Sequence, residues 1–154
     1  MKKCPDDYIG RWFSVLHRLS ISHVVKGLKE FNIGSGQIMF LLELYHCDGV
    51  NQEELSSYLN IDGANTTRSI KKLEQEGYVI RKADVNDKRA YRVYLTSKAL
   101  EIKPQILALL KEWEDTFLQD LSVEERTALL DLLKKIGHSI FDNPRCGMCN
   151  NNCC

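Results

Sequence analysis

Polar and basic side chains recur within one short segment of the chain, residues 62–75. If this segment is a helix, its outward positions include Asn65, Thr67, Arg68 and Lys71. An Asn side chain can pair with both hydrogen-bonding groups of adenine, and an Arg side chain with both acceptors of guanine. A Thr side chain can contact a thymine methyl group or a phosphate. These residue types predict a helix that reads base edges in the major groove of DNA.

The first residues of the same segment are small. Gly63 and Ala64 would let the start of the helix come close to a phosphate, which the positive end of the helix dipole attracts. An ordinary solvent-exposed amphipathic helix would carry a similar pattern, so this segment alone leaves both interpretations open.

A second group of charges lies in a turn-prone stretch further along the chain. Asp87, Lys88 and Arg89 place two cations next to an acid, and the acid precedes the arginine by two residues. At that spacing an aspartate can orient a guanidinium through charge-assisted hydrogen bonds. An arginine held in this way could enter a narrow minor groove, where the negative potential of DNA is concentrated. The alternative is a surface hairpin with unrelated charges.

The end of the chain carries a third group of reactive side chains. Four cysteines lie within the last nine residues, namely Cys146, Cys149, Cys153 and Cys154. Thiolates this close together could bind a soft metal ion such as Zn²⁺ or Cu⁺, or form disulfides on oxidation. The adjacent pair would strain a tetrahedral site. Metal or redox sensing and an incidental tail therefore remain as two interpretations.

The spacing of apolar residues predicts the elements that would position these groups. Helical periodicity and turn signals indicate a chain of four helices, a β-hairpin and two further helices. Asn51 with Glu54, and Ser122 with Glu125, have the spacing of capping boxes, while Asp62 and Thr96 are suitable N-caps. The expected helices are 8–31, 37–46, 51–58, 62–75, 97–119 and 124–141, and the expected strands are 78–82 and 91–95.

This order of elements predicts a mostly α fold with a small β-hairpin wing. It is a winged helix-turn-helix flanked by long N- and C-terminal helices. We expect residues 35–96 to form the DNA-binding domain, residues 1–34 and 97–142 a helical dimerisation region, and residues 143–154 a Cys-rich tail. The long helices have more apolar surface than one small winged domain can cover, which favours a homodimer.

Leu55 to Thr96 resembles the core of the MarR (multiple antibiotic resistance regulator) family. The strongest match is Asp87-Lys88-Arg89 followed by Leu95-Thr96, which resembles the family's wing signature, D-x-R with a downstream L-T. With the flanking helices, the similarity covers about residues 8–141.

The resemblance implies a homodimer that binds a palindromic operator in double-stranded DNA, usually as a repressor that a small molecule or oxidation releases. By position, it makes Arg89 the minor-groove residue and Asp87 its brace, and it makes Thr67 and Arg68 contacts of the recognition helix. Gly63 and Ala64 depart from the pattern, because many members have polar or basic residues there.

Family members often bind aromatic acids in a cleft between the dimer helices and the winged domain. The side chains that could line such a cleft in this chain are Trp12, Leu16, His17, His23, Met39 and Tyr45. An aromatic stripe at helical spacing is more often part of a core, and this alternative stays open.

Charge and composition narrow the function classes. The formal net charge is zero, yet residues 62–92 hold eight basic against five acidic side chains, and residues 93–142 hold six against nine. The basic segment 62–92 could therefore face an anion such as DNA, while the acidic segment 93–142 points away from it. No pair of nucleophile and base stands out, so we expect that the protein is not an enzyme and that it requires no cofactor.

The start of the chain lacks the apolar stretch of a signal peptide, and the longest apolar run, Ile38 to Leu42, is too short to span a bilayer. We expect a cytoplasmic protein without a membrane partner. The rival functions are a winged-helix protein–protein adaptor and a metal or redox protein that acts through its tail.

Overall fold

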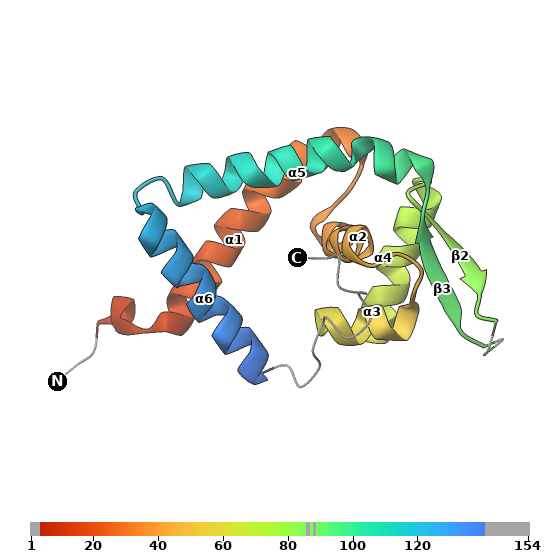
Figure 1. The fold of residues 1–154 in the computed structure, drawn as a ribbon, viewed down its shortest axis with the longest axis horizontal. Coiled ribbons are helices and arrows are strands. Elements are labelled where there is room, and N and C mark those ends of the chain that lie inside the picture. Colours follow the sequence, from red (N-terminus) through yellow and green to blue (C-terminus); the bar gives the residue numbers. More distant parts are fainter. Residues whose placement is uncertain (1–3, 86, 88, 141–154) are drawn as a thin grey trace.

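The computed structural model describes residues 4–85, 87 and 89–140, and its elements form two groups (Figure 1). Three long helices make up one group: α1 (Ile9–Leu28), α5 (Ser97–Phe117) and α6 (Val123–Ile140). The other group contains three shorter helices and a small sheet. These helices are α2 (Ser35–His46), α3 (Gln52–Leu59) and α4 (Gly63–Gln75); the 3-10 turns Pro5–Asp7 and Lys29–Phe31 flank α1.

The sheet has three antiparallel strands, one more than the sequence predicted. Strand β2 (Val79–Ala83) pairs with β3 (Tyr91–Leu95) as the expected hairpin, and the short β1 (Val50–Asn51) pairs with the other edge of β3. The mostly helical, winged fold is thus confirmed, and the two-stranded sheet is corrected to three strands in the order β1-β3-β2. A two-residue strand has no periodicity of its own, so the sequence gives no sign of it.

Side-chain caps begin the helices where the sequence predicted them. Asn51 accepts a hydrogen bond from the Glu53 backbone N–H at 2.8 Å and donates its own backbone N–H to Glu54 Oε2 at 3.0 Å, a complete capping box. Thr96 caps α5, and before α6 the Ser122 hydroxyl accepts the Glu125 backbone N–H while the Ser122 N–H donates to Glu125 Oε2.

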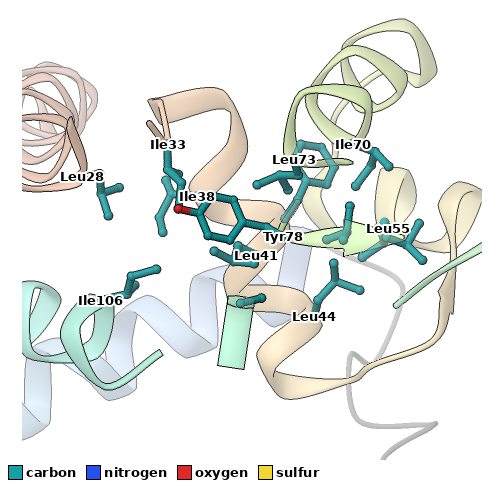
Figure 2. Packing of buried hydrophobic residues seen from close by; sticks show 14 of the residues in the cluster. Leu28, Ile33, Ile38, Leu41, Leu44, Leu55, Ile70, Leu73, Tyr78 and Ile106 are labelled. Carbon is teal, nitrogen blue, oxygen red and sulfur yellow. The ribbon is translucent and has the colours of Figure 1, made fainter. Parts of the chain in front are cut away.

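The core lies mainly between the short helices and the sheet, and Leu28 of α1 and Ile106 of α5 extend it to the long helices (Figure 2). The Tyr78 ring is buried among apolar side chains of α2 and α4, and its hydroxyl donates to the Phe31 carbonyl at 2.7 Å. This bond gives a buried polar group a partner and ties the start of the hairpin to the turn before α2. α4 and the hairpin therefore rest on one core, whose fully buried side chains include Phe40, Leu41, Leu44, Leu55, Ile70, Leu73, Val79 and Val93.

α5 runs unbroken through Pro104 and packs against α1. The two helices approach closely at Gly27, where an added Cβ would lie 2.3 Å from Leu109 Cδ1. Tyr45, on α2, donates its hydroxyl to the Ala99 carbonyl of α5 at 2.6 Å, so α5 is also bonded to the short-helix group.

The long helices leave much apolar surface uncovered within the single chain. α6 contains no buried residue at all, although an apolar stripe runs along it. Exposed apolar side chains are Tyr8, Ile9, Trp12, Phe13, Leu16 and Leu19 near or in α1, and Val123, Leu129, Leu130, Leu132, Leu133, Ile136 and Ile140 in α6. Within the described ranges, no helix combines the length and the apolar character needed to cross a membrane.

Candidate nucleic-acid interface

α4 divides cleanly into a buried and an exposed side. Its buried residues are Thr66, Ser69, Ile70 and Leu73, which pack onto the core. The six residues that the sequence placed on the outward side are all exposed in the structure: Gly63, Ala64, Asn65, Thr67, Arg68 and Lys71. α4 thus presents a continuous polar and basic face to solvent.

Three side chains on this face are joined in a row by hydrogen bonds. Asp62 caps the helix by accepting the Asn65 backbone N–H at 2.9 Å, and it also accepts the Asn65 side-chain amide. Asn65 Oδ1 in turn accepts a hydrogen bond from Arg68 Nη2 at 2.5 Å. The backbone and then the side-chain bonds from Asn65 lower the pKa of the Asp62 carboxyl below its ordinary value. The cap therefore stays ionised at neutral pH.

Thr67 is held by its own helix and by α3. Its hydroxyl donates to the Gly63 carbonyl at 2.8 Å and accepts from Gln52 Nε2 of α3 at 2.9 Å. Gln52 is not among the contacts predicted from the sequence, although it is the first residue of α3, just after the Asn51 cap. A polar side chain at that place lies where the first helix of a helix-turn-helix crosses a DNA backbone.

Gly63 has open space around it. No heavy atom lies within 4 Å of the position that a Cβ would occupy there. The fold itself therefore does not demand a glycine at the start of α4, which leaves the space in front of the helix free for a ligand.

The tip of the wing is organised by Asp87. Its Oδ1 accepts the Arg89 backbone N–H at 2.9 Å, and its carbonyl accepts the Ala90 backbone N–H at 2.9 Å. The sequence predicted that this carboxylate would orient the Arg89 guanidinium, whereas the bond in the structure orients the Arg89 backbone. Asp87 and Arg89 are exposed, and Lys88, which was predicted with them, lies outside the described residues.

β2 is bonded directly to the recognition helix. Arg81 Nε and Nη2 donate to Glu74 Oε2 of α4 at 3.0 and 2.7 Å, and these bonds lower the pKa of the Glu74 carboxyl. Sequence reasoning missed this pair, because residues seven apart on different elements give no local signal. The Arg81 side chain thus joins the wing to Glu74 of α4.

The six candidates for an effector cleft are spread over two elements. Trp12, Leu16, His17 and His23 are exposed on α1, and Trp12 Nε1 donates to the Asp6 carbonyl at 3.0 Å. On α2, Met39 is exposed and Tyr45 turns toward α5, where it bonds Ala99. Burial, with a smaller contribution from Tyr78, raises the pKa of Tyr45 to about 12.

Metal-ligating residues do not gather in residues 4–85, 87 and 89–140: no group of three or more His, Cys, Asp or Glu side chains there could hold a metal ion. The four tail cysteines, Cys146, Cys149, Cys153 and Cys154, lie outside the described residues. The prediction of a soft metal or redox site at these cysteines thus stays a prediction.

Comparison with known proteins supports a regulator that binds DNA. The sequence model of the MarR family matches residues 33–91 of this chain, from the turn before α2 to the first residue of β3. The chain is 32% identical over 110 residues to the HTH-type transcriptional regulator BilQ of Clostridium symbiosum (strain WAL-14163). The aligned region covers 71% of this chain and 76% of that protein.

Solved structures agree over the whole fold. A MarR transcriptional regulator from Methanosarcina mazei Go1 superposes with a TM-score of 0.82 at 39% identity, over 87% of this chain and 99% of that chain. A MarR family regulator from Listeria monocytogenes, complexed with a 26mer DNA, superposes with a TM-score of 0.79 at 30% identity, over 92% of this chain and 91% of that chain.

These relatives are transcriptional regulators and not enzymes. Their likeness extends over the recognition helix, the wing and the long helices that flank them. The chain belongs to the MarR family of DNA-binding, winged helix-turn-helix transcriptional regulators.

Proposed function

We propose that this protein is a homodimeric repressor that binds a palindromic operator in double-stranded DNA and releases it when an effector changes the dimer. The effector would be a small aromatic ligand, an oxidant or a metal ion. The observation that carries the proposal is the joint exposure of the α4 face and of Arg89 on elements that share one core. The proposed DNA contacts are Gly63, Ala64, Asn65, Thr67, Arg68, Lys71, Asp87, Lys88 and Arg89.

The dimensions of α4 suit a major groove. A helix of 13 residues is about 20 Å long at 1.5 Å per residue, and its N-terminal side chains would meet base edges. The wing lies next to α4 (Figure 1), so Arg89 would meet the DNA beside the segment that α4 reads. An arginine in a narrow minor groove gains from the concentrated negative potential there.

The uncovered apolar surface supports the dimer. Leu129, Leu133 and Ile136 follow helical spacing on α6, and each is 37–43% exposed in the single chain. Contact with a second copy would remove this surface from water, which is the main favourable term in association. The domain division follows: residues 1–34 and 97–142 for dimerisation, and residues 35–96 for DNA.

Two-fold symmetry would place two recognition helices about 34 Å apart, one turn of DNA. The matching operator is palindromic, with half-sites that each bind one α4 and one wing. A protein bound over such a site would block transcription that starts there, which supports the assignment as a repressor.

A small aromatic effector would bind beside exposed side chains of α1 and α2. Trp12 and Met39 are 47% and 48% exposed in the single chain, and they could stack on or pack against an aromatic ring at the dimer interface. A ligand there would act by fixing the long helices in an arrangement that no longer matches the DNA spacing. No cofactor is needed for DNA binding itself.

The experiment that tests the proposal begins with the DNA that the purified protein retains from its own genome. We expect one palindromic sequence to be enriched, bound by two chains, with an affinity that falls steeply with salt. Arg89→Ala should weaken binding by about 1–3 kcal/mol.

A matched control is Lys111→Ala, which removes an exposed cation on α5 whose Nζ lies 3.0 Å from Asp115 Oδ2. The control should bind the operator like the parent protein. If Arg89→Ala also binds like the parent, the wing does not contact DNA, and the adaptor function is favoured instead. An affinity that is insensitive to salt would count against phosphate contacts.

A further inference from the structure

The base of the wing contains a buried carboxylate that the proposed DNA contacts do not use. Asp84 directly follows β2, and only 6% of its surface is exposed. An ionised side chain in such a place requires partners, since burial removes the water that would otherwise solvate it. Its partners therefore indicate what the residue does.

The partners of Asp84 connect three parts of the molecule. Asp84 Oδ2 accepts from Arg92 Nε at 2.5 Å, and the same guanidinium donates through Nη1 to the Gly49 carbonyl at 3.0 Å. Residues 49 and 92 are 43 positions apart, so the bridge joins the hairpin to the turn after α2. Two N–H groups of one planar guanidinium fix both directions at once.

The turn that receives Arg92 is itself well fixed. Gly49 has φ of +73°, and a Cβ at this position would lie 2.7 Å from the Tyr94 ring. The Gly49 N–H donates to the Val93 carbonyl at 3.0 Å, and Asp48 Oδ1 accepts the Leu95 backbone N–H at 2.8 Å. The guanidinium is thus attached to a rigid point, next to a helix of the core.

On its other side, Asp84 is bonded to the wing tip. Its N–H donates to the Ala90 carbonyl at 2.9 Å, and its Oδ1 accepts the Asp87 N–H at 3.4 Å. Asp87 then accepts the Arg89 backbone N–H. A row of hydrogen bonds leads from the turn after α2, through Arg92, Asp84 and Asp87, to the backbone of Arg89.

We propose that Asp84 and Arg92 are positioning residues that hold the wing tip so that Arg89 meets DNA in one orientation. This inference rests on the proposed function, because it assumes that Arg89 contacts the operator. Neither side chain needs to touch DNA. Their contribution to affinity would come entirely through Arg89.

The test is a double-mutant cycle between Arg89 and the bridge, measured as operator affinity. In the parent protein, Arg89→Ala should lower affinity about tenfold or more. In a background carrying Asp84→Asn and Arg92→Met, which removes both charges of the pair together, Arg89→Ala should cost less than about threefold. In the bridge variant Arg89 is loosely held and contributes little to operator affinity, so its removal costs little.

The control is an exposed ion pair outside the wing and α4, Lys111 with Asp115 on α5. In the background Lys111→Met with Asp115→Asn, the cost of Arg89→Ala should remain at the parent value. If the bridge variant proves unstable, Arg92→Lys serves instead. It keeps the charge but loses the planar fork, so the cost of Arg89→Ala should be reduced there as well.

A second measurement does not depend on DNA. Hydrogen exchange of the Arg89 and Ala90 amides should be faster in the bridge variant and unchanged in the control. If Arg89→Ala costs the same factor in parent and bridge variant, the positioning role is overturned while the proposed function stands. If Arg89→Ala has no effect in the parent, the proposed function fails, and unchanged exchange would then overturn the bridge as well.

Discussion

Arg68 donates a hydrogen bond to the side chain of Asn65, whose own amide group donates to the Asp62 cap. Both hydrogen-bonding groups of Asn65 are therefore used within α4. Asn65 needs both groups to pair with an adenine, and Arg68 needs its forked donors to pair with a guanine. Asn65 must therefore break its side-chain bonds to Asp62 and to Arg68 before it can pair with a base. Arg68 has to break only its bond to Asn65.

This relationship leads to a prediction for base specificity. Arg68→Ala should lower operator affinity by about 1–3 kcal/mol and relax the preference at one base pair in each half-site. Asn65→Ala should weaken binding too, and the double variant should lose less than the sum, because the two side chains are in contact. Affinities for operators with each base replaced in turn give the measurement. A uniform loss over all these sequences would instead make Arg68 a phosphate contact.

Gly63 offers a test of how closely α4 approaches the DNA. Gly63→Leu should leave the free energy of unfolding unchanged or slightly higher, since the site has open space and leucine favours a helix. It should nevertheless weaken operator binding, because the added side chain would stand between the helix and a phosphate. Gly63→Ala is the matched control with little bulk. Urea unfolding and fluorescence anisotropy separate the two effects, and a Leu variant with parent affinity would place the phosphate elsewhere.

The apolar stripe of α6 predicts a dimer that charge can disrupt. Leu129→Glu with Leu133→Glu alters two neighbouring turns of α6, where the side chains are 37% and 42% exposed. Fully burying an exposed leucine contributes about 1.5–3 kcal/mol, so the part of each side chain that is still exposed here contributes about 1 kcal/mol, and the symmetry of a dimer doubles the loss. We expect sedimentation to give the mass of one chain.

Val85→Glu is the control for this experiment, since Val85 is 93% exposed near the wing tip and far along the chain from α6. The Val85→Glu variant should sediment with the same mass as the parent protein. A variant of α6 that still sediments as two chains would require a different interface.

Tyr45 predicts a change in stability at high pH. Tyr45→Phe removes the bond to the Ala99 carbonyl and should lower the free energy of unfolding by about 1 kcal/mol at neutral pH. Burial raises the pKa of Tyr45 to about 12, above the ordinary value near 10. Its contribution is therefore complete below pH 10 and is lost as the pH rises toward about 12.

Urea unfolding of parent and Tyr45→Phe protein over this range should show the two curves converging. A difference that grows with pH would contradict the assignment. Operator affinity at neutral pH, measured in parallel, shows whether the bond between α2 and α5 also affects DNA binding.

The tail hypothesis is tested by deletion of residues 145–154. DNA affinity should not change, because the proposed contacts lie on α4 and the wing. Any response of operator binding to Zn²⁺, Cu⁺ or peroxide should disappear if Cys146, Cys149, Cys153 and Cys154 carry it. If operator binding by the deletion protein still responds to these agents, the tail cysteines are not the sensor.

Local signals in the sequence predicted the helices well. Asn51, Asp62, Thr96 and Ser122 cap helices where expected, because a cap depends on residues only two or three positions away. Gly77, with φ of +77°, ends α4 as its position suggested. The exposure of the α4 face followed from the same helical periodicity.

Contacts between distant residues could not be predicted in this way. Strand β1 exists because Val50 pairs with Val93, and the Arg92 bridge exists because Gly49 lies beside it. In the sequence Asp84 is only one acid among the five of residues 62–92, whereas in the structure it is buried and bonded to Arg92 and Ala90. Such roles depend on where the fold brings separate segments, which residue spacing does not encode.

The close approach at Gly27 has a consequence for motion. With no room for even a methyl group beside the present Leu109 side chain, a larger residue at position 27 would have to displace Leu109 or part α1 from α5. α5 extends about 31 Å, from a residue that adjoins β3 to the turn before α6. A shift of α5 against α1 would therefore be felt at Gly27, and it would move the end of α5 that adjoins the wing.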